Sequence, residues 1–452
     1  MLGVNDSRLE PARRSPDTGP AAPSLAPGEQ RARPRRVAVI GAGITGLATA
    51  FRLERERPSW EVVVFEAEPH VGGKIRTAVR DGYTVDWGPN GFLASAPETL
   101  RLVRDLGLEE VLQPAATSAR KRYLYLDGGL RTLPATPPAF LASEVVPLHG
   151  RLRAALEIVL ATAGAGEESV HAFLARHFGR VFADALADAF VSGIAAGDPR
   201  ELSLDALFPR LRAMERTHRS LVLALIAQQR AARYARVASA APRGATEKGA
   251  SEKGAAPKDG AAPTRGLTSF RDGGMQRLLD ALRGALRGGV RLAARVEALE
   301  PRADGHDLRV AGASTGPFDD VVLTVPAPAA AALLRPHLPA AAEALAAIPY
   351  AGIRVFGLGF DRIDVPRALD GFGFLAARGQ GVRSLGVLWT SSLYPDRAPV
   401  GKVLLRVLAG GRLDPSMLEL TGEDALAAVR RDLRVSMGIT VEPEFVEAVA
   451  WQ

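Results

Sequence analysis

The sequence contains no cysteine. This excludes disulfide bonds, thiolate metal sites and a cysteine nucleophile, and it suits a reducing cytoplasm. The seven histidines are scattered and form no H-x-x-x-H pair, so we expect no metal site. The chain also lacks an uninterrupted apolar run of about 18 residues, so we expect no membrane-spanning helix. These absences favour a cytoplasmic protein whose chemistry does not depend on thiols or metals.

Aromatic residues are scarce, at 6%, and no nucleic-acid-binding module is recognisable, so nucleic acid is the least favoured partner. The formal net charge is nevertheless +7. A basic balance suits an anionic membrane face or an acidic small molecule. An Arg-rich and Ala-rich composition also arises from a GC-rich genome, and the charge alone does not separate these explanations.

The chain of 452 residues has the length of two or three domains. Residues 1–34 are rich in Pro, Ala and Arg without periodicity, and they predict a disordered tail. Residues 238–265 contain no Val, Ile, Leu, Met or aromatic residue, so they cannot bury apolar surface and predict a disordered, low-complexity insertion.

Between these segments the patterns change along the chain. Residues 35–115 read as strand, helix, strand, loop and helix, whereas residues 116–237 are mostly helical with a strand-like piece at "RYLYLDGGLRTLP". Residues 290–301 predict a strand and residues 318–334 a strand running into a helix. Residues 345–411 alternate strand and turn, and one further helix precedes the final "FVEAVAWQ".

The stretch "VAVIGAGITG" carries G-x-G-x-x-G at Gly41, Gly43 and Gly46, after a predicted strand and at the start of a predicted helix. The three glycines permit a tight turn, close approach of a pyrophosphate, and close helix–strand packing. Glu66 lies 20 residues beyond Gly46 at the end of the next strand, where a carboxylate binds a ribose diol. This combination predicts a dinucleotide site; the alternative is a glycine turn without a ligand.

A second glycine pair, Gly72 and Gly73, follows Glu66 and precedes Lys74 and Arg76. Backbone N–H groups at this pair would meet another side of the pyrophosphate, with positive charge beside them. The pair therefore favours FAD over NAD. The competing interpretation is a surface turn with solvated basic residues.

The run "EAEPHVGGKIRT" followed by "GYTVDWGPNGF" resembles the flavin-containing amine oxidase superfamily. More distant segments resemble its oxygen-dependent protoporphyrinogen oxidases, among them "KRYLYLDGGLRTLPATPPAFL", "SFRDGGMQRLLDAL" and "LGVLWTSSLYPDRAP". The resemblance implies an α/β fold with a Rossmann-type βαβ FAD domain, a sheet-based substrate domain and an inserted helical domain on the membrane. The FAD domain would comprise 35–115 and 266–330, the helical domain 116–237, and the substrate domain 331–452.

The resemblance also implies the activity. Protoporphyrinogen IX would lose six electrons in three flavin cycles to give protoporphyrin IX in haem biosynthesis, with dioxygen as acceptor and hydrogen peroxide as product. The same fold also oxidises coproporphyrinogen III, which carries four carboxylates instead of two. The resemblance allows a homodimer and a peripheral place on the inner face of the cytoplasmic membrane. No catalytic side chain is expected beyond the flavin, because the cofactor carries the chemistry.

By resemblance, the expected cofactor-binding residues are Gly41, Ala42, Gly43, Ile44, Thr45, Gly46, Glu66, Ala67, Gly72, Gly73, Lys74, Arg76, Gly88, Pro89 and Val296. Among these, Gly88 is expected against the flavin ring, since it lacks a Cβ, and Val296 is expected to reach the adenine through its backbone. The expected substrate-binding residues are Asn90, Arg122 and Phe372. Val296 and the three substrate residues also have plainer interpretations. Asn90 could cap a turn, and Arg122 could be a solvated charge at a strand end. Val296 could be an ordinary strand residue and Phe372 an ordinary core residue.

Members of this family usually continue beyond the present C-terminus with a tyrosine-containing segment and a late "GVGLND" stretch that closes the flavin site. Neither segment occurs in this sequence. We therefore expect a truncated chain that binds FAD weakly or folds poorly. A non-catalytic remnant remains an alternative to an active oxidase.

Overall fold

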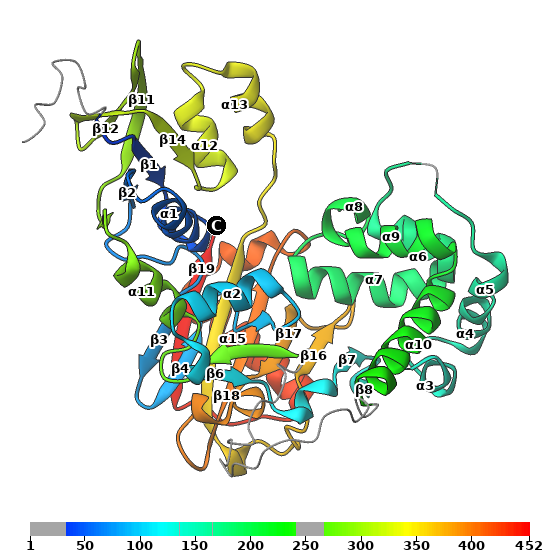
Figure 1. Ribbon diagram of the computed structural model, residues 1–452. Coiled ribbons are helices and arrows are strands. Elements are labelled where there is room, and N and C mark those ends of the chain that lie inside the picture. Colours follow the sequence, from blue (N-terminus) through cyan, green and yellow to red (C-terminus); the bar gives the residue numbers. More distant parts are fainter. Residues whose placement is uncertain (1–32, 135, 165, 241–265) are drawn as a thin grey trace, which may run out of the picture.

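The computed structural model describes residues 33–134, 136–164, 166–240 and 266–452. The predicted tail at 1–34 and the predicted insertion at 238–265 lie almost wholly outside the described residues. Figure 1 shows a small sheet with helices at one end, a large sheet below it, and a group of helices to one side.

The small sheet is parallel and has the strand order β10-β2-β1-β14. Its strands are β10 (Val290–Arg291), β2 (Glu61–Phe65), β1 (Arg36–Ile40) and β14 (Asp320–Leu323). Helix α1 (Ile44–Glu56) connects β1 to β2 and packs beside α11 (Gln276–Ala285). This β1–α1–β2 unit confirms the predicted Rossmann-type start, because a parallel strand pair requires a crossover connection.

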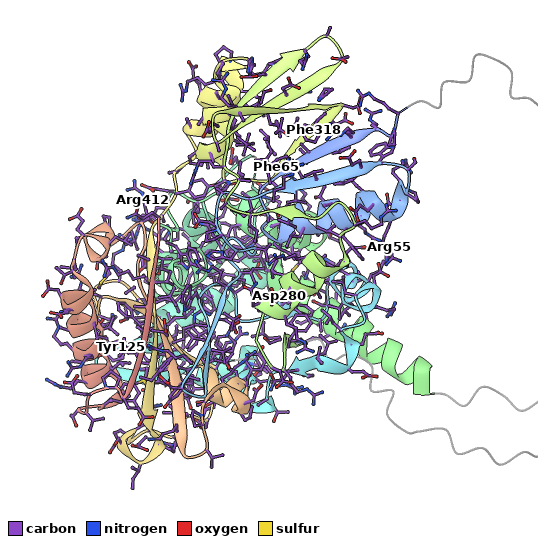
Figure 2. The ribbon with its side chains drawn as sticks, turned by 90° about the vertical axis from the view of Figure 1, so that its left-hand side faces the viewer. Arg55, Phe65, Tyr125, Asp280, Phe318 and Arg412 are labelled. Carbon is purple, nitrogen blue, oxygen red and sulfur yellow. The ribbon has the colours of Figure 1, made fainter. Side chains whose placement is uncertain are left out.

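Alternate residues of β1 and β2 pack against different layers. Val39 and Val64 belong to the core with α1 and α11, whereas Ile40 and Phe65 pack with an antiparallel sheet on the other side. That sheet consists of β11 (Val296–Arg302), β12 (Gly305–Val310) and β13 (Ala313–Phe318). The Phe65 and Phe318 rings meet edge to face with centroids 5.8 Å apart. Figure 2 labels both residues at this end of the molecule. Helices α12 (Ala327–Leu334) and α13 (Pro339–Ala346) complete this end.

The large sheet has seven strands in the order β19-β15-β18-β17-β16-β7-β8. They are β19 (Phe445–Trp451), β15 (Ile353–Asp361), β18 (Lys402–Gly410), β17 (Ser384–Trp389), β16 (Gly373–Ala376), β7 (Tyr123–Leu126) and β8 (Gly129–Thr132). All neighbours are antiparallel except β16 and β7. The strand-like piece predicted within the mostly helical segment 116–237 forms β7 and β8 of this sheet.

One face of the large sheet is covered by α15 (Gly422–Met437), whose Ala425, Val429 and Leu433 pack with Leu405 and Val407. We call the opposite side the inner face. Strand β4 (Tyr83–Asp86), paired with β3 (Thr77–Arg80), crosses this face and packs its tyrosine and valine there with Leu404. Helix α7 (Arg180–Ala195) meets the inner face at β16. The inner face thus lies between the dinucleotide-type unit and the helices.

The helical group contains α7 and several other helices, and apolar side chains of this group form two small cores. The others are α3 (Pro137–Ala142), α4 (Leu148–Ala155), α5 (Glu157–Leu160), α6 (Val170–Phe178), α8 (Leu204–Leu207), α9 (Pro209–His218) and α10 (Leu221–Ala240). His218 is exposed at the end of α9. None of the helices in the described ranges is long and apolar enough to cross a bilayer.

Shorter elements join these parts. A three-stranded sheet has the order β5-β9-β6, with β5 (Phe92–Leu93), β9 (Leu267–Phe270) and β6 (Leu112–Pro114). The remaining helices are α2 (Pro97–Asp105) and α14 (Thr390–Leu393), with 3₁₀ turns at Glu109–Val111, Thr117–Arg120, Arg362–Asp364, Pro395–Arg397 and Pro415–Leu418.

The sequence prediction of one strand over residues 290–301 is wrong. The structure contains two separate strands there, β10 and β11, joined by a turn. Ala293 in this turn has φ of 49°, a left-handed conformation that cannot continue a strand. The chain consequently leaves the parallel sheet and enters the antiparallel one.

Candidate dinucleotide and substrate sites

The glycine loop between β1 and α1 has the local geometry of a pyrophosphate cradle. Gly41 adopts φ of 106°, and a Cβ on Gly46 would lie 1.9 Å from the Gly41 carbonyl oxygen, so both positions require glycine. A Cβ on Gly43 would meet no protein atom within 4 Å. The N-terminus of α1 has no side-chain cap and no acidic residue in its first turn. Its N–H groups are therefore available to an anion.

Glu66 is fixed at the end of β2 by two backbone hydrogen bonds. Its carboxylate oxygens accept from the N–H groups of Ala42, at 2.7 Å, and Glu68, at 2.9 Å. A carboxylate has about four acceptor sites, so it retains capacity for a diol. The glycine loop and the carboxylate are thus held together by the backbone.

The second glycine pair lies directly against the first loop. The Gly72 N–H donates to the Ala42 carbonyl at 2.9 Å, and Gly72 and Gly73 have φ of 125° and 57°. Lys74 and Arg76 follow, the guanidinium 4.6 Å from the centroid of the Trp87 ring. Within the described residues neither cation makes an ion pair. Both remain available to a phosphate.

These segments surround a cavity of about 1040 Å³, at the upper end for ligand sites. The expected residues that line it are Gly41, Gly43, Ile44, Thr45, Glu66, Ala67, Gly72, Gly73, Lys74, Arg76 and Val296. Further lining residues that the sequence reasoning missed are Thr324, Val325 and Trp451. Uncapped N–H groups, an open position at Gly43, a fixed carboxylate and two unpaired cations fit FAD.

Four expected cofactor residues do not line this cavity. Ala42 and Gly46 act behind it, through the hydrogen bonds and packing given above. Gly88 and Pro89 lie in the loop that follows β4. A Cβ on Gly88 would be 1.8 Å from the carbonyl oxygen of Lys74. Protein packing, not only ligand approach, therefore requires glycine at position 88. Contact of Gly88 and Pro89 with the flavin stays a prediction.

The expected substrate residues occupy two places. The Arg122 guanidinium lies 5.1 Å from the centroid of the half-buried Phe372 ring, at the start of β7 and β16. Asn90 is buried after β4, and its Nδ2 has no hydrogen-bond partner in the described residues. Nothing in the geometry brings Asn90 into contact with the other two.

Two buried residues near β4 were missed by the sequence reasoning. Asp86 accepts from the Thr77 hydroxyl at 2.6 Å and from the Met275 N–H at 3.0 Å. Arg406 lies within β18 and is buried. The signal in the sequence was a charged residue inside the otherwise apolar run "KVLLRVLAGG".

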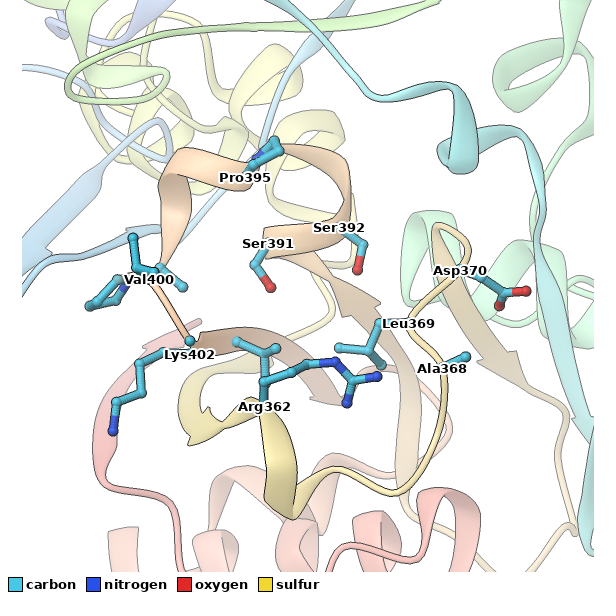
Figure 3. Close-up of a pocket in the computed structure, with 13 residues that line it drawn as sticks. Arg362, Ala368, Leu369, Asp370, Ser391, Ser392, Pro395, Val400 and Lys402 are labelled. Carbon is cyan, nitrogen blue, oxygen red and sulfur yellow. The ribbon is translucent and has the colours of Figure 1, made fainter.

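Another hollow, of about 480 Å³, is lined by Arg362, Asp370 and Lys402 among others, as Figure 3 shows. Lys402 pairs with Asp361 at 2.8 Å, and Arg362 donates to the Val365 carbonyl at 2.7 Å. Asp370 accepts from Lys121 and Tyr123. Lys402 and Asp370 are therefore each paired with an opposite charge elsewhere on the chain, whereas Arg362 is held by backbone carbonyls.

The βαβ unit, its pyrophosphate cradle and the large sheet beside it define a dinucleotide-dependent oxidoreductase of the flavin type. The chain belongs to the family described as flavin containing amine oxidoreductase, which it matches over residues 44–452. This membership confirms the expected flavin cofactor and oxidoreductase class.

Two relatives match along most of their length. The coproporphyrinogen III oxidase of Propionibacterium freudenreichii subsp. freudenreichii is 36% identical over 91% of this chain and 79% of that protein. The protoporphyrinogen oxidase 2 of Arabidopsis thaliana, chloroplastic/mitochondrial, is 30% identical over 92% and 83%. A solved Exiguobacterium sp. 255-15 protein, whose name proposes a protoporphyrinogen oxidase, has a TM-score of 0.75 at 22% identity, covering 92% of this chain and 86% of that one. This likeness supports the fold alone.

Proposed function

We propose that the protein is an FAD-dependent oxidase that converts protoporphyrinogen IX to protoporphyrin IX in haem biosynthesis, with dioxygen as acceptor. The observation that carries the proposal is the continuity of two surfaces. Trp451 lines the dinucleotide cavity, and β19 belongs to the same sheet as the strands beside Arg122. A cofactor in the cavity would therefore border an apolar sheet face, next to which a flat substrate could lie.

The cofactor would be held by the residues already described. The α1 N-terminus and Gly72–Gly73 would take the pyrophosphate, Glu66 a ribose, and Val296 the adenine through its backbone. A bound flavin would supply the redox chemistry, which is the uptake of hydride from the substrate and the passage of two electrons to dioxygen to give hydrogen peroxide. The remaining groups of the protein bind, orient and exclude water.

The substrate would be held by complementary chemistry. The Arg122 guanidinium suits bidentate binding of a propionate, and Phe372 beside it supplies an apolar surface for the macrocycle. Asn90, buried with an unused amide N–H, can donate to a polar group of the ring. No acid–base pair of side chains is required, because the cofactor supplies the redox step.

Coproporphyrinogen III is the second candidate substrate. Its ring undergoes the same oxidation, and its four carboxylates need more cations at the site than the two of protoporphyrinogen IX. A relative named for this substrate matches the chain, and the inner face holds the buried Arg406 in addition to the exposed Arg122. These two observations favour keeping both substrates in every assay.

The proposal is tested with the purified protein supplied with FAD. Absorbance from roughly 300 to 550 nm after gel filtration reports whether the flavin stays bound. Each porphyrinogen is then added in air, and porphyrin fluorescence and peroxide are followed against a control without protein. We expect both products to rise together. Retained flavin with no porphyrin formation above the control would refute the proposed function.

We further propose that the helical group rests on a membrane surface. Helices α4 and α5 expose a run of apolar side chains, with Leu148 60% and Val159 80% exposed. Exposed apolar clusters on a basic protein suit the interface of anionic lipids. Co-sedimentation with anionic vesicles should fall for Val159→Asp and stay unchanged for the exposed Val400→Asp, which lies outside the helical group. The expected homodimer stays a prediction.

A further inference from the structure

Arg406 is a charged residue in the middle of an apolar strand. The neighbouring Leu405 and Val407 pack under α15, so the alternation of the strand puts Arg406 on the inner face. Leu408, two residues further on the same face, is half-buried. The cation therefore belongs to the surface that borders the proposed substrate position.

The guanidinium is buried without a dedicated partner. Arg406 is only 6% exposed, its Nε has no hydrogen-bond partner, and none of its nitrogens bonds to a described residue. Burial lowers the pKa of Arg406 to about 10, while the charge of Asp86 opposes this shift. A buried cation without a close anion is unfavourable, so its position points to an anionic ligand.

Two carboxylates lie in this part of the molecule. Asp86 accepts the two hydrogen bonds described above through Oδ1, while its buried Oδ2 has no hydrogen-bond partner in the described residues and lies 3.9 Å from the buried Arg397. Glu447, two strands away on the inner face, pairs with Arg80 at 3.2 Å. Neither carboxylate makes a hydrogen bond with Arg406. The contrast within the same molecule is Arg212, also buried, which bonds to Glu215 and Asp205.

Strand register relates Arg406 to Arg122. Arg406 is opposite Leu388, Leu388 is opposite Gly373, and the parallel pairing of Phe374 with Tyr123 continues this row to Arg122. Three strand spacings of about 4.8 Å put the two arginines roughly 14 Å apart. Between them lie a half-buried leucine and a glycine. The row is an apolar floor with one cation at each end.

We propose that Arg406 binds a substrate carboxylate at the end of this floor opposite Arg122, and that it thereby selects a porphyrinogen with carboxylates on more than one edge. This inference rests on the proposed function and sharpens its substrate. Protoporphyrinogen IX carries both propionates on one edge and engages one arginine at a time. Coproporphyrinogen III carries four and engages both.

The kinetic test uses the full chain loaded with FAD and the variant Arg406→Gln. The KM for coproporphyrinogen III should rise about 10- to 100-fold, because the variant loses a charge-assisted hydrogen bond to a carboxylate. The KM for protoporphyrinogen IX should change less than about threefold. Arg406→Lys should keep much of the preference. Arg412→Gln, an exposed arginine paired with Glu201 just beyond β18, is the matched control and should change neither KM.

A binding test does not depend on turnover. Quenching of coproporphyrin III fluorescence measures its affinity for the unaltered protein and for Arg406→Gln, and the tetramethyl ester serves as the uncharged probe. The variant should weaken binding of the acid and leave the ester unchanged. Thermal unfolding verifies that the variants are folded.

The outcomes separate the two proposals. Three results would overturn the role of Arg406. The first is an equal rise in KM for both porphyrinogens, and the second is equal binding of coproporphyrin III by the variant and the unaltered protein. The third is an altered flavin spectrum with an unchanged substrate preference. If the unaltered, flavin-loaded protein oxidises neither porphyrinogen, the proposed function fails. The acid-against-ester comparison would then still decide whether Arg406 binds carboxylates.

Discussion

The dinucleotide cavity and the inner face of the large sheet are built in different ways. The cavity is made mainly by residues 41–76, and its decisive groups are backbone N–H groups and glycines. The inner face is made by side chains from strands that are far apart in the sequence, and its decisive groups are arginines and leucines. A local backbone pattern therefore marks the first region in the sequence, whereas the second exists only once strand register is set.

The sharpest way to separate backbone from ligand roles is to compare two glycines of the first loop. Gly46→Ala places a methyl group 1.9 Å from a backbone oxygen, so we expect lower thermal stability and loss of flavin. Gly43→Ala meets no protein atom, so stability should hold while FAD affinity falls about 100-fold, because the methyl group occupies pyrophosphate space. Thermal unfolding and flavin titration measure both effects.

The control for this pair is Gly284→Ala in α11, where an added methyl group also meets nothing. It should retain FAD and gain slightly in stability, because alanine favours helix. Normal FAD affinity in Gly43→Ala would contradict a pyrophosphate over that position.

A smaller effect is expected for Glu66→Gln. The amide cannot accept at both positions, so FAD affinity should fall about tenfold, the size of one charge-assisted hydrogen bond. The KM for porphyrinogens, measured with saturating FAD, should not change. An altered KM with unchanged FAD affinity would mean that Glu66 serves the substrate instead.

The reverse pattern is expected on the inner face. Phe372→Ala should raise KM for both porphyrinogens by roughly threefold to tenfold through lost apolar contact, with unchanged FAD affinity. Ile363→Ala, at a highly exposed apolar position, is the matched control. If Phe372→Ala leaves both KM values unchanged, the half-buried ring does not contact substrate.

The smallest effect on function concerns the helical group, where buried charges are paired. Burial raises the pKa of Glu215, but hydrogen bonds from Arg176, Arg212 and His177 outweigh it and lower the pKa to about 2. A lowered folded-state pKa gives stability that is present above the ordinary value and is lost as pH falls toward 2.

Thermal unfolding between roughly pH 5 and 2 should therefore show a falling Tm that is shallower in Glu215→Gln. The oxidase activity at neutral pH should change little in comparison with the glycine variants. Parallel pH profiles in both proteins would show that Glu215 does not carry this dependence.

Sequence reasoning succeeded where structure is local. The glycine spacing, Glu66 and the second glycine pair are close along the chain, and their strand–helix–strand context is visible in the pattern. The prediction of a single strand failed at Ala293, because an alanine in the sequence does not indicate a left-handed backbone conformation. Sequence reasoning missed Arg406, because the register that aligns residues 406, 388, 373 and 122 is a tertiary property. It also missed the carbonyl that packs against Gly88.

The most direct test of the account is the reductive half-reaction. The FAD-loaded protein is mixed without oxygen with either porphyrinogen, and the visible flavin absorbance is recorded before and after air is admitted. We predict bleaching by at least one porphyrinogen, appearance of porphyrin, and recovery of the flavin bands in air. Bound flavin that neither porphyrinogen bleaches would contradict the account.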